Sequence, residues 1–297
     1  MEREKILLMG VGMQGQKTVK AVRALGNTNI RKVFVDKQMP EGNLVINGTF
    51  VQIPFYLELG SWEPAYPVKA WLSDEKNMHL LENMFQGVKL LVVVCGIGGE
   101  QTFVAKELME YCKKNHSEVE IYFVGSIPFR KQTDYVTNYI SRIMIDFLKR
   151  IKVAYSVVEN ECLFHYYEEF QAAYEVSHLY LAQIIDGVLF MTSSKKRSDG
   201  NEQVKLPGDF WKRPVYYMEF DVDSRNPEVP LLENPLLPMD FVKDTGVAEI
   251  YLRSRLEQQQ VNVLLELHDL IERQIGDIEC FYYEGKDKEK DSSGWCV

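Results

Sequence analysis

The stretch ILLMGVGMQGQKTVKAV, residues 6–22, joins an apolar strand pattern to a helical pattern through Gly10, Gly12 and Gly15. Glycines in a strand-to-helix turn let backbone N–H groups approach an anion, and the helix N-terminus adds a favourable partial charge. The spacing Gly-x-Gly-x-x-Gly also occurs in plain tight turns. Because a strand precedes it and a helix follows it, we interpret this turn as a phosphate-binding loop.

A second glycine-rich turn follows the most apolar strand of the chain. That strand pattern, VKLLVVVCGIGG at 88–99, contains Gly96, Gly98 and Gly99 and leads into a helical pattern at 102–114. Close packing of a helix on a strand explains one of these glycines but not three within four positions. Two such turns on neighbouring strands predict that a phosphate chain is held from two sides.

Strand-like and helix-like patterns alternate through the first two hundred residues. This alternation predicts right-handed βαβ crossovers and an α/β fold, with a mostly parallel sheet and helices on both faces. Ligands of such sheets bind beyond the carboxyl ends of the strands, where both glycine turns fall. The expected strands cover 5–11, 31–36, 88–99, 119–129 and 153–158, and the expected helices cover 16–25, 74–85, 102–114, 134–151 and 166–191.

The composition changes after residue 192. The polar segment 192–209 indicates a loop or linker, and the segment 226–238 contains four prolines, which regular structure does not tolerate. We therefore expect a ligand-binding domain over 1–192 that includes the long helix, a smaller α+β domain over 193–283 and a charged flexible tail over 284–297. The second domain has strand patterns at 215–222 and 246–255 and a helical pattern at 256–275.

The composition also excludes several classes of protein. The net charge of −9 argues against a protein that coats nucleic acid, and no apolar run is long enough to span a bilayer. The N-terminal MEREK lacks the apolar core of a signal peptide, so we expect a cytoplasmic protein. The five cysteines and five histidines are scattered, which indicates free thiols and no metal site.

The first glycine turn, taken alone, favours a dinucleotide site. Asp36 ends the second strand about twenty residues further on, where the acid that binds the ribose of NAD belongs. An NAD(P)-binding Rossmann-type oxidoreductase is therefore one interpretation. Such an enzyme needs only one phosphate loop, however, and no catalytic His, Lys or Tyr–Lys pair is recognisable in the sequence.

The order of the motifs resembles the tubulin/FtsZ superfamily of GTP-binding filament proteins. In that family GxGxxGN follows the first strand and GGGTGTG follows the fourth, at the places of GVGMQGQ and GIGGEQT in this chain. VGSIPF at 124–129 resembles the family's TxPF turn, and VVENECL at 157–163 resembles its IPNxxL segment. FQAAYEVSHLYLAQIIDGVLFM at 170–191 is similar to the family's long central helix. The resemblance covers residues 5–192 and fades beyond them.

The resemblance implies a protein that binds GTP or GDP, with Mg²⁺, and assembles head to tail with its own copies into filaments. It implies that Asn160 and Phe170 face the base. It also implies that Tyr174 lies where the central helix normally presents an Asp to guanine. The implied phosphate-binding residues are Gly10, Gly12, Gly15, Gln16, Gly96, Gly98 and Gly99.

Several positions depart from the family's pattern. Glu100, Gln101 and Thr102 replace the glycine–threonine run, and Glu100 brings a negative charge toward the phosphates. In the family the next subunit supplies acidic residues for GTP hydrolysis. Asp209 in LPGDFWKR matches the first of these acids and is the candidate catalytic residue, whereas Lys212 falls where the second acid belongs. A degenerate tubulin-like scaffold without GTPase activity is therefore a third interpretation.

Overall fold

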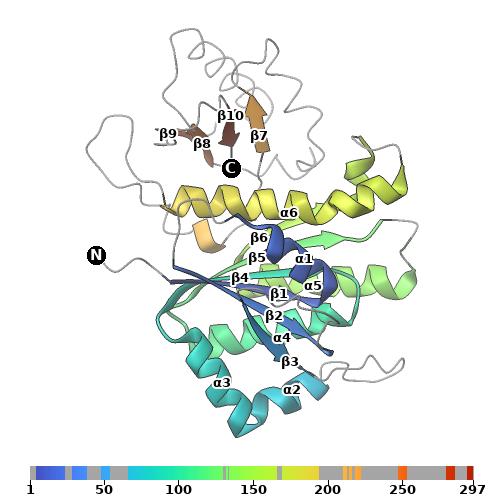
Figure 1. Ribbon diagram of the computed structural model, residues 1–297, viewed down its shortest axis with the longest axis vertical. Coiled ribbons are helices and arrows are strands. Elements are labelled where there is room, and N and C mark those ends of the chain that lie inside the picture. Colours follow the sequence, from blue (N-terminus) through green and yellow to red (C-terminus); the bar gives the residue numbers. More distant parts are fainter. Residues whose placement is uncertain are drawn as a thin grey trace. The chain divides into compact units, whose positions relative to one another are not determined.

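The computed structural model of the chain divides into two compact units, which are described here one at a time (Figure 1). The first comprises Met1–Ile185 and Asp209–Pro214, and the second comprises Asp186–Gly208 and Val215–Val297. The division falls inside the helix α6 (Phe170–Ser193), whereas we expected a boundary after residue 192. The structure describes residues 5–23, 29–38, 48–53, 66–129, 132, 134–165, 169–193, 210–212, 214–215, 218–221, 247–252, 279–284 and 293–296.

A six-stranded sheet forms the centre of the first unit. Its strands are β1 (Lys5–Val11), β2 (Ile30–Asp36), β3 (Thr49–Gln52), β4 (Val88–Gly96), β5 (Glu120–Ile127) and β6 (Ala154–Glu159). The strand order is β3-β2-β1-β4-β5-β6, and every neighbouring pair is parallel. The strands that end in the two glycine turns, β1 and β4, are therefore neighbours at the centre of the sheet.

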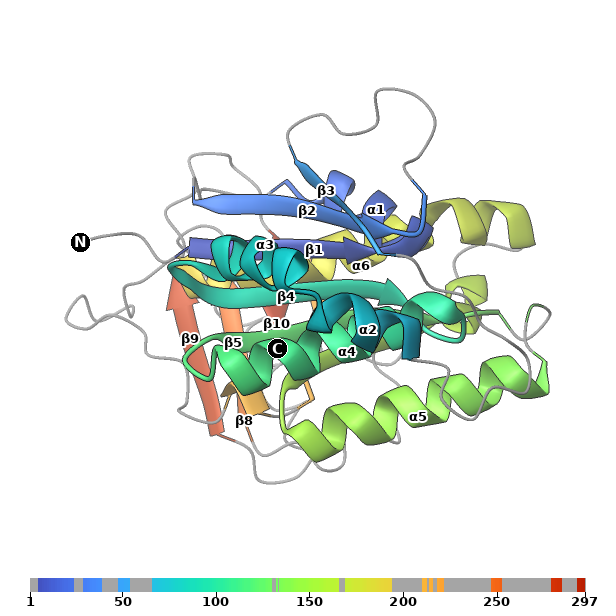
Figure 2. The same cartoon turned by 90° about the horizontal axis from the view of Figure 1, so that it is seen from below.

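Helices cover both faces of this sheet, which confirms the α/β fold class. They are α1 (Gly12–Ala21), α2 (Tyr66–Ser73), α3 (Glu75–Phe85), α4 (Glu100–Asn115), α5 (Tyr135–Ile151) and α6, with 3₁₀ turns η2 (Asn160–His165) and η3 (Phe210–Lys212). Figures 1 and 2 show α2, α3, α4 and α5 on one face, and α1 with the N-terminal part of α6 on the other.

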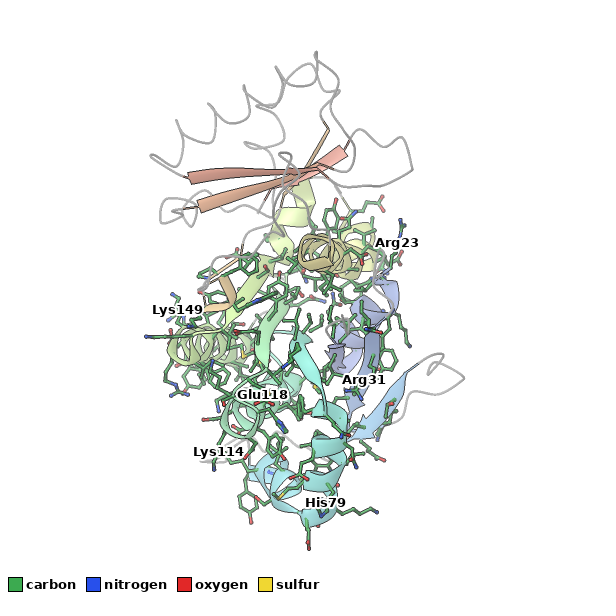
Figure 3. All side chains as sticks on the ribbon, turned by 90° about the vertical axis from the view of Figure 1, so that its left-hand side faces the viewer. Arg23, Arg31, His79, Lys114, Glu118 and Lys149 are labelled. Atoms are coloured by element: carbon green, nitrogen blue, oxygen red, sulfur yellow. The ribbon has the colours of Figure 1, made fainter. Side chains whose placement is uncertain are left out.

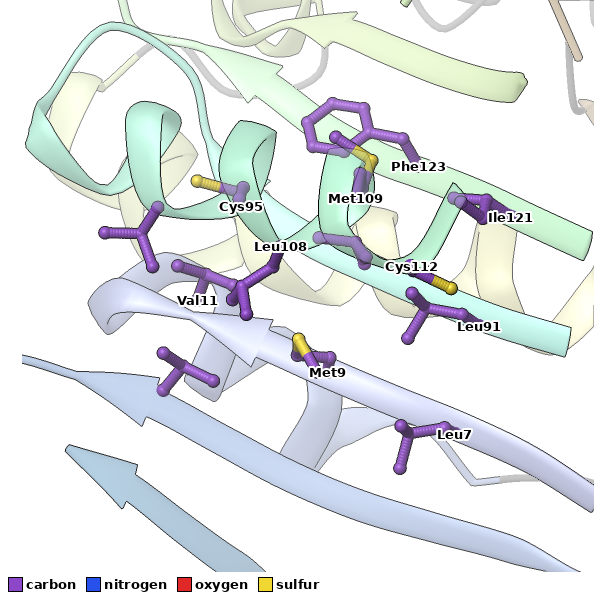
Figure 4. Packing of buried hydrophobic residues seen from close by; sticks show 14 of the residues in the cluster. Leu7, Met9, Val11, Leu91, Cys95, Leu108, Met109, Cys112, Ile121 and Phe123 are labelled. Atoms are coloured by element: carbon purple, nitrogen blue, oxygen red, sulfur yellow. The ribbon is translucent and has the colours of Figure 1, made fainter. Parts of the chain in front are cut away.

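The main core lies between the sheet and the layer of α2 to α5. Figure 4 shows Leu7, Met9 and Val11 of β1 beside Leu91 and Cys95 of β4, with side chains of α4 packed above them. Residues at alternate positions of a strand point to the same face, so the intervening apolar residues serve the opposite layer. Burial on both faces explains why these strands are almost continuously apolar.

The helices of the first unit begin in two different ways. Asp74 and Asp134 accept hydrogen bonds from backbone N–H groups in the first turns of α3 and α5 and so cap these helices. The residues that precede α1 and α4 are Val11 and Gly99, which provide no side-chain hydrogen bond to the helix. The N-termini of α1 and α4 therefore keep an electrostatic preference for an anion.

The second unit contains a four-stranded sheet of order β7-β10-β8-β9. The strands are β7 (Met218–Asp221), β8 (Val247–Leu252), β9 (Glu279–Glu284) and β10 (Ser293–Cys296). β10 is antiparallel to both β7 and β8, and β8 is parallel to β9. The strand β10 lies within the segment 284–297, for which we expected a flexible tail. The helical pattern at 256–275 lies outside the described residues.

Charged side chains lie on the outside of the first unit. Figure 3 shows Arg31, Lys114 and Lys149 at its periphery, and all three are exposed. Among the helices in the described part of the chain, none is both long and apolar enough to cross a membrane.

Candidate functional site

A cavity of about 340 Å³ lies at the carboxyl ends of the parallel strands. Gly12 follows β1, Gly98 follows β4, Pro128 follows β5 and Asn160 follows β6, and all four residues line this cavity. The cavity thus extends along the sheet edge from β1 to β6. Both its position and its size are typical of small-molecule sites in α/β folds.

The glycines of the first turn have different surroundings. A Cβ on Gly10 would lie 2.6 Å from the carbonyl oxygen of Gly15, and one on Gly15 would lie 2.2 Å from that of Val94. These two glycines allow α1 to pack directly on the sheet, and neither lines the cavity. Gly12 does line it, with a φ of +69° that side chains rarely adopt. Of the three glycines of this first turn, only Gly12 therefore has access to the cavity.

Gln16 and Asp36 bind each other rather than the cavity. The Gln16 side chain is 6% exposed, and its Nε2 donates a hydrogen bond to Asp36 Oδ2 at 2.7 Å. Asp36 Oδ1 accepts a second one from the backbone N–H of Lys37 at 2.8 Å. Neither residue lines the cavity. The phosphate contact implied for Gln16 and the ribose contact considered for Asp36 thus have no counterpart in this geometry.

Thr102 holds the second glycine turn from inside the protein. Its hydroxyl accepts a hydrogen bond from the Gly98 N–H at 3.0 Å and donates one to the Gly96 carbonyl oxygen at 3.5 Å. The φ of Gly98 is +120°, so a side chain there would be strained. Gly96, Gly98 and Gly99 all line the cavity. The Gly98 N–H is used within the turn, and the Thr102 N–H donates to the Gly99 carbonyl oxygen at 3.1 Å.

Gln101 lies between the two glycine turns. A Cβ on Gly12 would lie 2.3 Å from Gln101 Cγ, and one on Gly99 would lie 2.9 Å from Gln101 Oε1. The side chain therefore extends from α4 across to the start of α1. A ligand that contacts both turns has to share this space with the Gln101 carboxamide. The sequence marked Gln101 only as a departure from a family pattern, and no local signal indicates this placement.

The charges around the cavity favour an anion. Lys17 of α1 lines the cavity, and none of the described lining residues is an Asp or Glu. Glu100 does not line it, and its Oε2 forms an ion pair with Lys37 Nζ at 3.2 Å. This partly exposed pair offsets some of the repulsion that we expected from Glu100. The uncapped N-termini of α1 and α4 add positive potential at the same place.

Asn160 and Tyr174 form the β6 side of the cavity. The Asn160 side chain is 6% exposed, and its Oδ1 is buried without a hydrogen-bond partner among the described residues. Such an orphaned acceptor costs free energy until a ligand or water donates to it. The ring of Tyr174 stacks on Phe170 with a centroid separation of 6.2 Å, and Lys17 Nζ lies 5.9 Å from its centroid. A buried amide beside an aromatic wall fits a planar nitrogen heterocycle.

Phe170 lies behind Tyr174 rather than on the cavity surface. It packs edge-on against Phe129 with a centroid separation of 4.9 Å, in a cluster with Leu163 and Ala173. It is absent from the described lining residues. Phe170 therefore supports the Tyr174 wall instead of facing a ligand itself.

The candidate catalytic residue, Asp209, lies outside the described residues. Lys212 is described, ends η3 and is exposed. In the described part of the chain, no three His, Cys, Asp or Glu side chains are grouped closely enough to hold a metal ion.

Two of the comparisons with known proteins find nothing: no protein-family model and no curated protein matches the chain. Solved structures do match it. The W319Y mutant of FtsZ from M. jannaschii has a TM-score of 0.73 at 16% identity, over 99% of this chain and 90% of that one. CetZ from Methanosaeta thermophila has a TM-score of 0.72 at 15% identity, over 99% and 85%. CetZ2 from Haloferax volcanii, as a GTPγS-bound protofilament, has a TM-score of 0.68 at 14% identity, over 98% and 92%. This chain therefore has a divergent tubulin/FtsZ-like fold, as the order of its motifs predicts.

Proposed function

We propose that this chain binds a guanosine nucleotide, GTP or GDP, in the cavity and assembles head to tail with its own copies. The observation that carries the proposal is the pair of uncapped helix N-termini, α1 and α4, at one cavity. In the same unit α3 and α5 have aspartate caps. Two helix N-termini that line the same cavity and have no side-chain cap provide a binding site for an external anion.

The cavity suggests how the nucleotide would lie. The phosphates would approach Gly12, Gly99 and the first turns of α1 and α4. Lys17, whose Nζ lies 5.9 Å from the Tyr174 ring centroid, adds positive charge to the cavity. The base would approach Asn160, whose buried Oδ1 has no partner among the described residues, and the Tyr174 ring. The phosphates would then meet two helix N-termini that have no side-chain cap, and the base would meet Asn160 Oδ1, which has no hydrogen-bond partner among the described residues.

The direction of the cavity favours this arrangement over a dinucleotide. A dinucleotide whose ribose binds the acid after the second strand would extend over β1 and β2. The cavity instead extends from β1 toward β6, on the side of β1 away from β2. Asp36 is held by Gln16. We therefore prefer a mononucleotide to NAD(P).

Mg²⁺ would enter with the nucleotide and would neutralise part of the phosphate charge. The described lining residues include hydroxyl and amide oxygens, such as those of Ser126, Thr137 and Gln101, but no carboxylate. They fit a Mg²⁺ ion that is held mainly by phosphate oxygens and water, which is a common mode for this ion.

Assembly is inferred from the fold. One solved structure with this fold is a GTPγS-bound protofilament, and a heterologous contact that does not close produces such filaments. We leave hydrolysis out of the proposal, because Lys212 brings a cation to the place of the second acid. The use of the Gly98 N–H by Thr102 and the position of Gln101 favour the nucleotide-free scaffold as a second candidate.

The nucleotide carried by the purified protein tests the proposal. We expect denaturation to release GTP or GDP, identified by chromatography, and the emptied protein to bind GDP in calorimetry. Release of NAD or NADP would contradict the proposal. No released nucleotide and no calorimetric response to millimolar GDP would favour the scaffold.

A variant at Asn160 ties binding to the cavity. Asn160→Leu keeps the side-chain size but removes the amide, so we expect roughly tenfold weaker GDP binding without loss of stability. The control is Asn115→Leu. Asn115 lies at the C-terminal end of α4 and is not among the described lining residues of the cavity, so this variant should bind GDP as the wild type does. Assembly is tested by pelleting with GTPγS, and a wild type that never pellets at any salt or Mg²⁺ concentration would contradict it.

A further inference from the structure

The side chain of Gln101 fills the space between the two glycine turns. Gln101 is the second residue of α4 and lines the cavity. Its Cβ, Cγ and Cδ atoms lie 3.0, 2.3 and 3.1 Å from the position that a Cβ on Gly12 would take, and its Oε1 lies 2.9 Å from the corresponding position on Gly99. The aliphatic part of the side chain thus packs on the first turn, and the carboxamide lies beside the second.

Gln101 lies near the end of the cavity that is opposite to Asn160. Along the sheet edge, the strands next to the cavity have the order β1, β4, β5 and β6, with Gly12 after β1 and Asn160 after β6. Gln101 lies beside the turns that follow β1 and β4. A nucleotide whose base approaches Asn160 extends its phosphate chain toward these turns. The last phosphate of the chain is therefore the group that needs the space of the Gln101 side chain.

The contacts of Thr102 hold the backbone at Gln101 in place. Thr102 is 2% exposed. Its hydroxyl accepts a hydrogen bond from the Gly98 N–H at 3.0 Å, and its own N–H donates to the Gly99 carbonyl oxygen at 3.1 Å. Because this backbone fixes the Gln101 Cβ, only rotation about the side-chain bonds can clear the space. Such a rotation has to remove the aliphatic part from its packing on Gly12, so a phosphate placed there displaces a packed side chain.

The charges around the cavity act in the opposite direction. Lys17 lines the cavity, and the N-termini of α1 and α4 attract negative charge. A nucleoside triphosphate carries more negative charge than a diphosphate, so charge alone would favour the triphosphate. Tighter binding of the diphosphate would therefore report the space that Gln101 occupies and not the potential of the site.

We infer that Gln101 limits the length of the phosphate chain, so that the site binds GDP more tightly than GTP. The inference rests on the proposed nucleotide site and names the form of the nucleotide that this site prefers. Forcing a group into occupied space costs roughly a factor of ten or more in an equilibrium constant. Gln101 is a specificity-determining residue in this account, because it acts through the volume of its side chain.

Binding of GDP and GTPγS to the nucleotide-free, full-length protein tests the inference. GTPγS has three phosphate groups and resists hydrolysis, so its binding can be measured without conversion to GDP. We measure both Kd values with Mg²⁺ by calorimetry, at protein concentrations at which nothing pellets. We expect GDP to bind the wild type at least about tenfold more tightly than GTPγS.

Two substitutions separate the volume of the side chain from its amide. Gln101→Ala removes every side-chain atom beyond Cβ, so we expect the preference for GDP to disappear. Gln101→Met keeps an unbranched side chain of similar length but has no amide. Because the space between the turns stays filled, Gln101→Met should keep the preference for GDP.

The matched control is Gln171→Ala. Gln171 is the second residue of α6, as Gln101 is of α4. Its Nε2 donates a hydrogen bond to Glu175 Oε1 at 2.6 Å, and it is not among the described lining residues of the cavity. The ratio of the two Kd values in Gln171→Ala should therefore equal that of the wild type.

The outcomes separate the inference from the function beneath it. GTPγS binding to the wild type as tightly as GDP, or more tightly, would overturn the inference and leave the nucleotide site standing. An unchanged preference for GDP in Gln101→Ala would overturn the role of Gln101. Binding of neither nucleotide to the wild type or to Gln101→Ala would overturn both the inference and the proposed function. Should Gln101→Ala fail to fold, the wild type and Gln101→Met decide the inference, and loss of the preference in Gln101→Met would overturn it.

Discussion

At Gly15 the backbone of α1 lies so close to β4 that a Cβ would stand 2.2 Å from the Val94 carbonyl oxygen. That oxygen belongs to a strand at the centre of the sheet, so it cannot move without disturbing its neighbours. At Gly99 the nearest atom to a new Cβ is the end of the flexible Gln101 side chain, at 2.9 Å. Glycines of similar sequence context thus have different roles, one in packing and one at the cavity.

Substitution by alanine should therefore change the free energy of unfolding differently at these two glycines. We expect Gly15→Ala to lower the free energy of unfolding by about 2 kcal/mol or more, since overpacking against backbone forces the helix to shift. Gly99→Ala, the matched control, should lie within about 0.5 kcal/mol of the wild type. Urea unfolding followed by circular dichroism measures both. Equal losses in the two variants would contradict this assignment.

Sequence motifs alone could not separate these roles. The spacing of Gly10, Gly12 and Gly15 predicts that the backbone closely approaches another group. It does not distinguish a ligand from the neighbouring sheet. Gln16 and Asp36 show the same limit, because their hydrogen bond depends on how α1 packs beside β2. The placement of Gln101 depends on the distance between two helices, which no local pattern encodes.

At the scale of elements, the apolar strands were the most predictable part of the fold. β1 and β4 are buried on both faces, and their near-continuous apolar runs record that burial directly. The four-residue strand β3 was missed because it is too short to display a period. The helix α2 was missed although Pro67 in its first turn is a known start signal.

A buried thiol on helix α4 makes the free energy of unfolding depend on pH. Its Cys112 lies in the core, and burial raises the pKa of the thiol from 9.0 to about 12, with Glu118 adding to the shift and Lys113 opposing it. The folded state therefore holds this proton more tightly than the unfolded chain does. The corresponding stabilisation is fully present below pH 9 and is lost as the pH rises toward 12.

We accordingly expect the free energy of unfolding to fall as the pH rises above 9. In Cys112→Ala, which has no thiol to ionise on unfolding, the fall should be less steep. A residual slope should remain, because burial also raises the pKa of Cys95. Urea midpoints measured between pH 8 and pH 11 test this expectation. Parallel pH dependences in the two proteins would contradict it.

At the scale of the whole molecule, the parallel sheet explains why residues far apart in sequence meet at one edge. Gly12, Gly98 and Asn160 follow three different strands whose carboxyl ends are aligned. The alternation of strand and helix patterns predicts that both glycine turns lie at this edge, and the resemblance to the tubulin/FtsZ superfamily adds Asn160. The sequence does not predict β10, since that strand pairs with β7 and β8, which are distant in sequence.

The central claim is that the uncapped N-terminus of α4 holds a phosphate, and Gly99 allows a direct test of it. Gly99 has the extended conformation of an N-cap, with φ −118° and ψ −174°, where aspartate is a favoured residue. Gly99→Asp should therefore keep or slightly raise the stability of the protein. Its carboxylate should occupy the proposed phosphate-binding position. Gly99→Asn is the matched control, because it caps the helix without adding a charge.

The measurement is the thermal unfolding midpoint of the three proteins, with and without GDP. At a GDP concentration a hundred times its Kd, we expect the wild-type midpoint to rise by about 5 °C. Gly99→Asn should keep part of this rise. Gly99→Asp should show none, with a midpoint in the absence of GDP at or above that of the wild type. If GDP raised the unfolding midpoint of Gly99→Asp as much as that of the wild type, the assignment of the phosphate-binding position to the N-terminus of α4 would be contradicted.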